Sequence, residues 1–118
     1  MPLALSVVEA AAVILALAVS VVGRLTLAPV AAESGDTEVV IAQTAFPPTV
    51  TVAAGDSAVF VDNQDPYTHT FTVDELGVNQ ALVAGQSARV EITAVPGEYR
   101  YYCAIPGHEF MEGTLLVQ

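Results

Sequence analysis

The chain has 118 residues, a length that suits one domain of ordinary size with an appendage and leaves little room for a second domain. Its formal net charge is −10, it contains no lysine, and from Glu33 onward only Arg89 and Arg100 are basic. Because an acidic surface repels phosphates, this composition argues against nucleic-acid binding. The charge favours solubility or adaptation to a salty medium, and steering of a basic partner is the alternative.

The apolar residues concentrate at the N-terminus, in the run AAAVILALAVSVV, and no charge lies between Glu9 and Arg24. We predict a hydrophobic helix within residues 1–32 that is either a membrane anchor or a signal peptide. Residues 3–27 are long enough to span a bilayer, and no basic residue precedes the run, which slightly favours the anchor. The small residues at 30–32 provide a peptidase site, which favours the signal peptide. Both interpretations place the rest of the chain outside the cytoplasmic membrane.

A polar, acidic linker is predicted over residues 33–37, and residues 38–118 have the pattern of one all-β domain. Eight short runs rich in Val, Thr, Tyr and Phe are separated by Gly, Pro, Asn and Asp. The runs are EVVIAQ, TVTVAAG, SAVFVDN, HTFTVD, QALVAG, SARVEIT, GEYRYYC and GTLLVQ. Their spacing of about 8 to 12 residues is typical of a β-sandwich or barrel. We expect no long helix after Arg24.

Cys103 is the only cysteine of the chain, so an internal disulfide is excluded. Taken alone, such a residue is most often a small buried hydrophobic side chain. Strand alternation in GEYRYYC places Cys103 and Tyr101 on the core face, and Arg100 and Tyr102 on the outer face. The strand then ends at AIPG, where the chain turns.

The loop after this strand carries further side chains that bind soft metals. His108 follows Cys103 by five positions, and Met111 follows His108 by three. The fourth donor should come from another strand, and the one remaining histidine, His69, begins a strand after the turn DNQDPY. A histidine there is often structural, but two histidines, a thiolate and a weakly bound methionine are together the ligands of a blue-copper electron-transfer site.

These segments resemble the cupredoxins, the plastocyanin-like small blue copper proteins, over about residues 38–118. DNQDPYTHTFTV is similar to the segment with the first histidine, and GEYRYYCAIPGHEFMEGTLLV is similar to the C-terminal ligand loop and final strand. The resemblance implies a Greek-key β-sandwich of seven to eight strands that binds one type 1 copper ion. It also implies that His69, Cys103 and His108 are equatorial ligands and that Met111 is the axial ligand.

The ligand loop departs from the plastocyanin pattern. Four residues separate Cys103 from His108 and two separate His108 from Met111, whereas plastocyanins commonly have a shorter first interval and a longer second one. The second interval looks like that of the copper loop in subunit II of cytochrome c oxidase. Ala104 stands where the second cysteine of that binuclear site would be, so a binuclear centre is excluded. Thr70 stands where many relatives have asparagine.

We therefore predict a mononuclear type 1 copper protein that transfers electrons outside the cytoplasmic membrane by cycling between Cu(II) and Cu(I). It is not expected to be an enzyme, because no coordination position is left for a substrate. The expected partners are redox proteins, such as a c-type cytochrome or a membrane oxidoreductase, which dock on apolar residues around His108. Tyr102 is a second candidate entry point for electrons, although an ordinary strand tyrosine is the simpler interpretation.

Other functions stay open at this stage. The chain could be a cupredoxin-like subunit of a membrane respiratory or photosynthetic complex, or a copper-binding or copper-delivery protein. It could also be a structural zinc domain that uses His69, Cys103 and His108. The expected location is the periplasm or the cell surface, with attachment to the membrane if the N-terminal segment is retained and a soluble secreted or periplasmic protein if it is cleaved.

Overall fold

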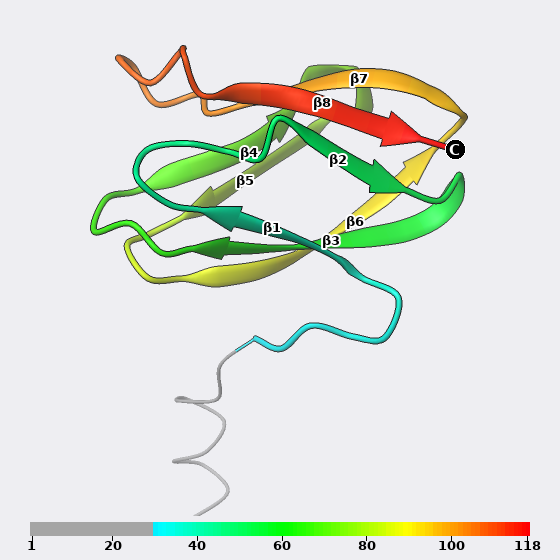
Figure 1. Ribbon diagram of the computed structural model, residues 1–118, viewed down its shortest axis with the longest axis horizontal. Coiled ribbons are helices and arrows are strands. Elements are labelled where there is room, and N and C mark those ends of the chain that lie inside the picture. Colours follow the sequence, from blue (N-terminus) through cyan, green and yellow to red (C-terminus); the bar gives the residue numbers. More distant parts are fainter. Residues whose placement is uncertain (1–29) are drawn as a thin grey trace, which may run out of the picture.

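The computed structural model describes residues 30–118, which form two packed β-sheets (Figure 1). The strands are β1 (Thr37–Ile41), β2 (Thr49–Val52), β3 (Gly55–Asn63), β4 (His69–Val73), β5 (Val78–Leu82), β6 (Ser87–Ala94), β7 (Gly97–Tyr102) and β8 (Glu112–Val117). A short 3-10 turn, η1 (Asp74–Leu76), joins β4 to β5. The predicted all-β sandwich of seven to eight strands is confirmed, with eight strands.

The strand order brings four loops to one end of the sandwich. One sheet has the order β1-β3-β6 and the other has the order β2-β8-β7-β4-β5. β1 pairs with β3 in parallel and β2 with β8 in parallel, and the remaining pairs are antiparallel. The loops after β1, β3, β5 and β7 consequently lie together, on the left in Figure 1. The start of β4 and the end of β7 therefore meet at this end.

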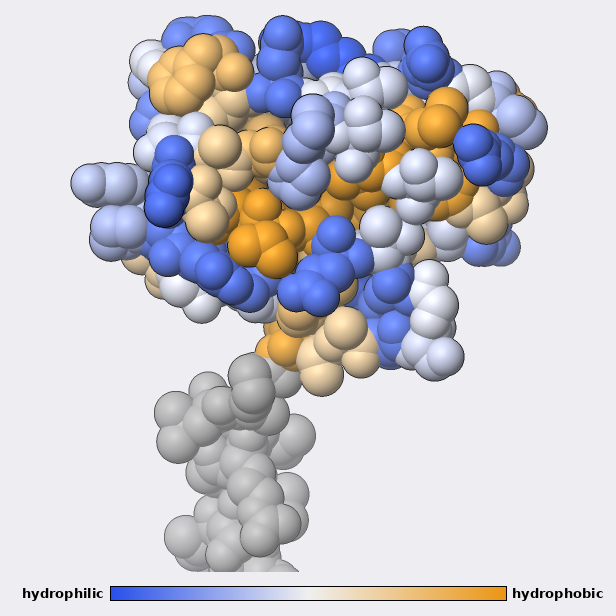
Figure 2. Space-filling model, in the orientation of Figure 1, coloured by the Kyte–Doolittle hydropathy of each residue, from blue (hydrophilic) through white to orange (hydrophobic). Residues whose placement is uncertain are grey.

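Alternating side chains of both sheets fill the space between them, as the period of a β-strand requires. The completely buried side chains include Phe71 from β4, Leu82 from β5 and Tyr101 from β7. Cys103 is also fully buried and Arg100 is exposed, which confirms the alternation predicted for this strand. Gly113 makes room for the Tyr101 ring, because a Cβ atom at Gly113 would overlap it. Figure 2 shows apolar groups across the middle of one face, between hydrophilic margins.

The chain before β1 is held on the domain. Arg89 donates from Nε to Asp36 Oδ2 at 2.9 Å and from Nη2 to Asp36 Oδ1 at 3.0 Å. Thr37, the last residue of the predicted linker, is the first residue of β1. The predicted hydrophobic segment, up to residue 29, lies outside the described residues. Residues 30–118 contain no helix that is long and apolar enough to cross a membrane.

Candidate metal centre

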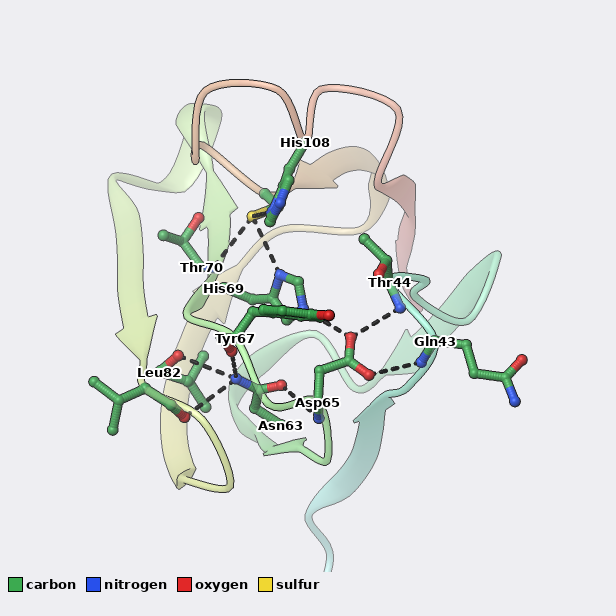
Figure 3. A network of polar contacts seen from close by, with 11 residues as sticks. Gln43, Thr44, Asn63, Asp65, Tyr67, His69, Thr70, Leu82 and His108 are labelled. Atoms are coloured by element: carbon green, nitrogen blue, oxygen red, sulfur yellow. Dashed lines mark hydrogen bonds and ion pairs between the residues drawn. The ribbon is translucent and has the colours of Figure 1, made fainter.

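Three of the predicted metal ligands converge at the end of the sandwich where the four loops meet. His69 is the first residue of β4, Cys103 directly follows β7, and His108 lies in the loop between β7 and β8 (Figure 3). Cys103 Sγ lies 3.9 Å from His69 Nδ1 and 3.7 Å from His108 Nδ1. The three ligand atoms all lie within 4.8 Å of one another. Residues 34 positions apart in sequence are thus brought into one potential coordination sphere.

The separations between these donor atoms fit one type 1 copper ion. Nitrogen and sulfur ligands lie about 2.0–2.3 Å from a metal, so two of them in a trigonal plane are about 3.8 Å apart. The two sulfur-to-nitrogen distances in the structure, 3.9 and 3.7 Å, are close to that value. Two imidazoles and one thiolate are also the equatorial donors of blue-copper sites.

Met111 closes the loop that carries the ligands. The Cys103 N–H donates to the Met111 carbonyl at 3.0 Å, and the Met111 N–H donates to the His108 carbonyl at 2.9 Å. The Met111 side chain is buried and belongs to the same core cluster as Cys103. The backbone therefore holds Met111 beside two of the other predicted ligands, and its role as axial ligand stays a prediction.

A tight turn shapes the unusual interval between Cys103 and His108. The His108 N–H donates to the Ile105 carbonyl at 2.9 Å, and Gly107 between them has φ 89°. Proline followed by glycine with positive φ fits a type II turn, because Pro106 presets the first central position and glycine tolerates the second. This turn folds the chain back, so that the His108 imidazole reaches the Cys103 sulfur.

Thr70 connects the two strands that carry His69 and Cys103. Its backbone N–H donates to Cys103 Sγ at 3.4 Å. Its hydroxyl oxygen accepts a hydrogen bond from the Ala104 N–H at 2.8 Å. Thr70 thus uses one backbone group and one side-chain group to hold both the ligand sulfur and the residue after it.

Two buried polar side chains that the sequence did not reveal support His69. His69 Nε2 lies 2.8 Å from Asp65 Oδ2, which leaves His69 Nδ1 facing Cys103 (Figure 3). Asn63 is fully buried, donates to the Tyr67 and Leu82 carbonyls at 2.8 and 3.1 Å, and accepts from the Asp65 N–H at 3.1 Å. Both residues lie in the segment DNQDPY, whose composition indicates a turn but not which side chains face inward.

The Asp65 carboxylate also holds the loop after β1. Its oxygens accept hydrogen bonds from the Gln43 and Thr44 N–H groups at 2.7 and 2.8 Å. Gln43 and Thr44 have φ 53° and 56°, a left-handed backbone that costs non-glycine residues roughly 1–3 kcal/mol each, and these hydrogen bonds offset that cost. Burial alone would raise the pKa of Asp65, but the hydrogen bonds from Thr44, His69 and Gln43 outweigh burial and hold this pKa below its usual value.

Replacement of Asp65 by asparagine should loosen both His69 and the loop after β1. In the Asp65→Asn variant an amide NH₂ replaces one of two accepting oxygens and faces a donor, so we expect a loss of about 1–3 kcal/mol of unfolding free energy in urea titrations. We also expect copper affinity to fall about 10–100-fold, as is typical for partners of ligating histidines. Asp62→Asn is the control, because Asp62 bonds to Gln64 and Ser87 instead. Equal effects of the two substitutions would contradict this role of Asp65.

Comparisons with known proteins agree with this architecture. The profile of the cupredoxin-like domain family matches residues 9–117. A reduced amicyanin variant superposes with a TM-score of 0.61 and 22% sequence identity, over 74% of this chain and 86% of that chain. Amicyanin from Paracoccus versutus (Thiobacillus versutus) gives a TM-score of 0.60 and 19% identity, over 74% of this chain and 85% of that chain.

A further similar structure is auracyanin A, a "blue" copper protein from the green thermophilic photosynthetic bacterium Chloroflexus aurantiacus. It gives a TM-score of 0.59 and 20% identity, over 69% of this chain and 96% of that chain. No protein with a curated description matches this sequence. At these identities the structural matches establish the fold, and the profile match over most of the chain establishes the family. The chain belongs to the cupredoxin-like family.

Proposed function

We propose that this protein is a mononuclear type 1 copper electron carrier that works outside the cytoplasmic membrane. His69, Cys103 and His108 are the equatorial ligands and Met111 is the axial ligand. The observation that carries the proposal is the position of Cys103 Sγ, which lies 3.9 and 3.7 Å from two imidazole Nδ1 atoms. The bound copper ion supplies a one-electron exchange between Cu(II) and Cu(I).

The protein contributes a rigid setting for this exchange. His69 and Cys103 are fully buried, and Asp65 and Thr70 hold them with hydrogen bonds. Side chains locked in this way cannot rearrange much when the charge at the site changes by one. Little rearrangement means a low barrier to electron transfer, which is the property required of a carrier.

The surface around His108 is suited to a redox partner. His108 is only partly buried, and its ring centroid lies 6.4 Å from that of Phe110, whose side chain is 66% exposed. Tyr67 and Val83, each 59% exposed, lie on neighbouring loops at the same end of the sandwich. We call Tyr67, Val83 and Phe110 the His108 surface. An exposed apolar surface beside the site favours brief docking of a protein such as a c-type cytochrome or a membrane oxidoreductase.

Entry through the outward-facing Tyr102 is less favoured. The Arg100 guanidinium carbon lies 4.3 Å from the centroid of the Tyr102 ring, and the Tyr102 hydroxyl donates to Asp74 Oδ1 at 2.9 Å. Arg100 also donates to Glu112 Oε2 at 2.8 Å, which fixes it over the ring. Because a charged group covers this ring, the His108 surface is the better docking site.

The proposed location is the periplasm or the cell surface. It rests on the apolar run between Glu9 and Arg24, which would direct the following residues across the membrane. The domain stays attached to the membrane if this run is retained. Mass spectrometry of the protein purified from its native cells would distinguish an anchored from a cleaved form.

The absorption spectrum tests the copper site. The copper-loaded protein should be intensely blue, because the colour of such sites comes from the copper–thiolate bond, and the Cys103→Ser variant should lose this colour. Voltammetry of the blue protein should show a reversible one-electron wave. A Cu(II) protein with only weak absorption would contradict the proposal, and tight zinc binding without a stable copper adduct would indicate the structural zinc domain instead.

The Met111→Leu variant tests the axial ligand. Leucine fills a similar volume, so the domain should lose less than about 1.5 kcal/mol of stability and should keep copper and the blue colour. The reduction potential should rise, because a thioether that donates to Cu(II) is replaced by a group that does not. An unchanged potential in voltammetry would show that the Met111 sulfur does not contact the metal.

Electron transfer to a c-type cytochrome tests the His108 surface. Phe110→Ala should lower the second-order rate constant by on the order of tenfold in stopped-flow measurements, as expected for the loss of one central aromatic contact. Val95→Ala is the matched control, since Val95 is 71% exposed but lies between β6 and β7, at the opposite end of the sandwich. If both variants slow the reaction equally, docking does not take place at the His108 surface.

A further inference from the structure

A chain of three polar side chains leads from the cysteine ligand to the edge of the larger sheet. Thr70 Oγ1 lies 2.9 Å from Thr72 Oγ1, and Thr72 Oγ1 donates to Asn79 Oδ1 at 2.9 Å. Thr70 and Thr72 are two positions apart on β4, so both lie on the face opposite Phe71, which packs in the core. Asn79 is the partner of Thr72 on β5, the last strand of this sheet.

The burial of the two threonines makes these contacts important. Thr70 is 7% exposed and Thr72 is 5% exposed, although both lie on the outer face of the sheet. A buried hydroxyl without a partner loses its hydrogen bonds to water and destabilises the fold. Within residues 30–118, no buried side-chain nitrogen or oxygen lacks a partner. The two hydroxyls therefore depend on each other and on Asn79.

The number of hydrogens that each group can donate determines which atom donates in each hydrogen bond of this series. Each hydroxyl has one hydrogen to donate, and an amide oxygen can only accept. Since Thr72 donates to Asn79 Oδ1, the hydrogen bond between the two threonines must be donated by Thr70. The lone pairs of Thr70 Oγ1 then remain for the Ala104 N–H, which donates to it at 2.8 Å. Asn79 thus sets the orientation of a hydroxyl beside the metal centre.

We propose that Thr72 and Asn79 are positioning residues that act through Thr70 on the sulfur of Cys103. This inference rests on the proposed copper site and extends it to side chains that do not touch the metal. Thr70 donates its backbone N–H to Cys103 Sγ at 3.4 Å and receives the N–H of Ala104. If the Thr70 hydroxyl loses its fixed orientation, its hydrogen bond from the Ala104 N–H becomes less well aligned, Thr70 is held less firmly and the N–H···S hydrogen bond weakens.

Through the hydrogen bond to the Cys103 sulfur, the series of side chains from Thr70 to Asn79 affects the reduction potential of the proposed copper site. An N–H donor stabilises a sulfur that carries more negative charge, and the sulfur carries more negative charge in the reduced site. A weaker N–H···S bond therefore lowers the potential. Variants that interrupt the chain at Thr72 or Asn79 should shift the potential in this direction, although neither side chain contacts Cys103.

The test compares Thr72→Val, which keeps the shape of the side chain but removes the hydroxyl, with Thr72→Ser, which keeps the hydroxyl. In the full-length, metal-free protein, NMR hydrogen exchange of the Ala104 amide should be roughly two- to tenfold faster in Thr72→Val, and normal in Thr72→Ser. Thr93→Val is the control, since Thr93 bonds to Asp56 on the exposed surface of the other sheet. The copper-loaded Thr72→Val protein should have a lower potential than Thr72→Ser.

Asn79→Ala provides a second test, because Asn79 is the exposed member of the hydrogen-bonded series and its substitution endangers folding least. It should also speed exchange at Ala104 and lower the potential. Unchanged Ala104 exchange in Asn79→Ala, or equal exchange in Thr72→Val and Thr72→Ser, would overturn the proposal. A parent protein that is not blue would refute the copper function, whereas the exchange measurement on metal-free protein would still decide the role of the chain.

Discussion

The hydrogen bonds between Thr70 and the Cys103–Ala104 segment are the contacts on which the metal centre depends. β4 and β7 form a backbone pair at Thr72 and Tyr102. Nearer the site, the Thr70 N–H bonds to the Cys103 sulfur and the Thr70 hydroxyl accepts from Ala104. Side-chain atoms thus continue the connection between the strands to the end of the sheet. His69, the residue before Thr70, is fixed relative to Cys103 as a result.

Most of the fold could be predicted because its strands are short runs rich in Val, Thr, Tyr and Phe that are separated by Gly, Pro, Asn and Asp. All eight runs correspond to strands, and the largest displacement concerns the run over residues 80–85, which forms β5 over Val78–Leu82. That run ends in a turn, where the Gln86 N–H donates to the Val83 carbonyl and Gly85 has φ 73°. Because this turn begins at Val83, the strand ends at Leu82 and the Val83 side chain is exposed although it is apolar.

The candidate ligands could be picked out from the sequence because cysteine and histidine are rare in this chain, whereas the side chains that support them are of common types. Asp65 could not be predicted, because its inward orientation depends on the Gln43 and Thr44 amides, more than twenty positions away in sequence. The hydrogen bonds that link Thr70, Thr72 and Asn79 could not be predicted either, because only the pairing of β4 with β5 places Asn79 opposite Thr72. The sequence therefore reveals the chemistry of the site, and the pairing of distant segments determines its rigidity.

The predicted ligands differ in how they are held, and this difference matches the two demands on the proposed electron carrier. His69 and Cys103 are fully buried and bonded to Asp65 and Thr70, so they provide the fixed part of the site. His108 is carried by the loop after β7 and is partly exposed beside Phe110. The redox partner that we propose to dock there would approach the site through the most accessible of the predicted ligands. Rigidity and access thus come from different segments of the chain.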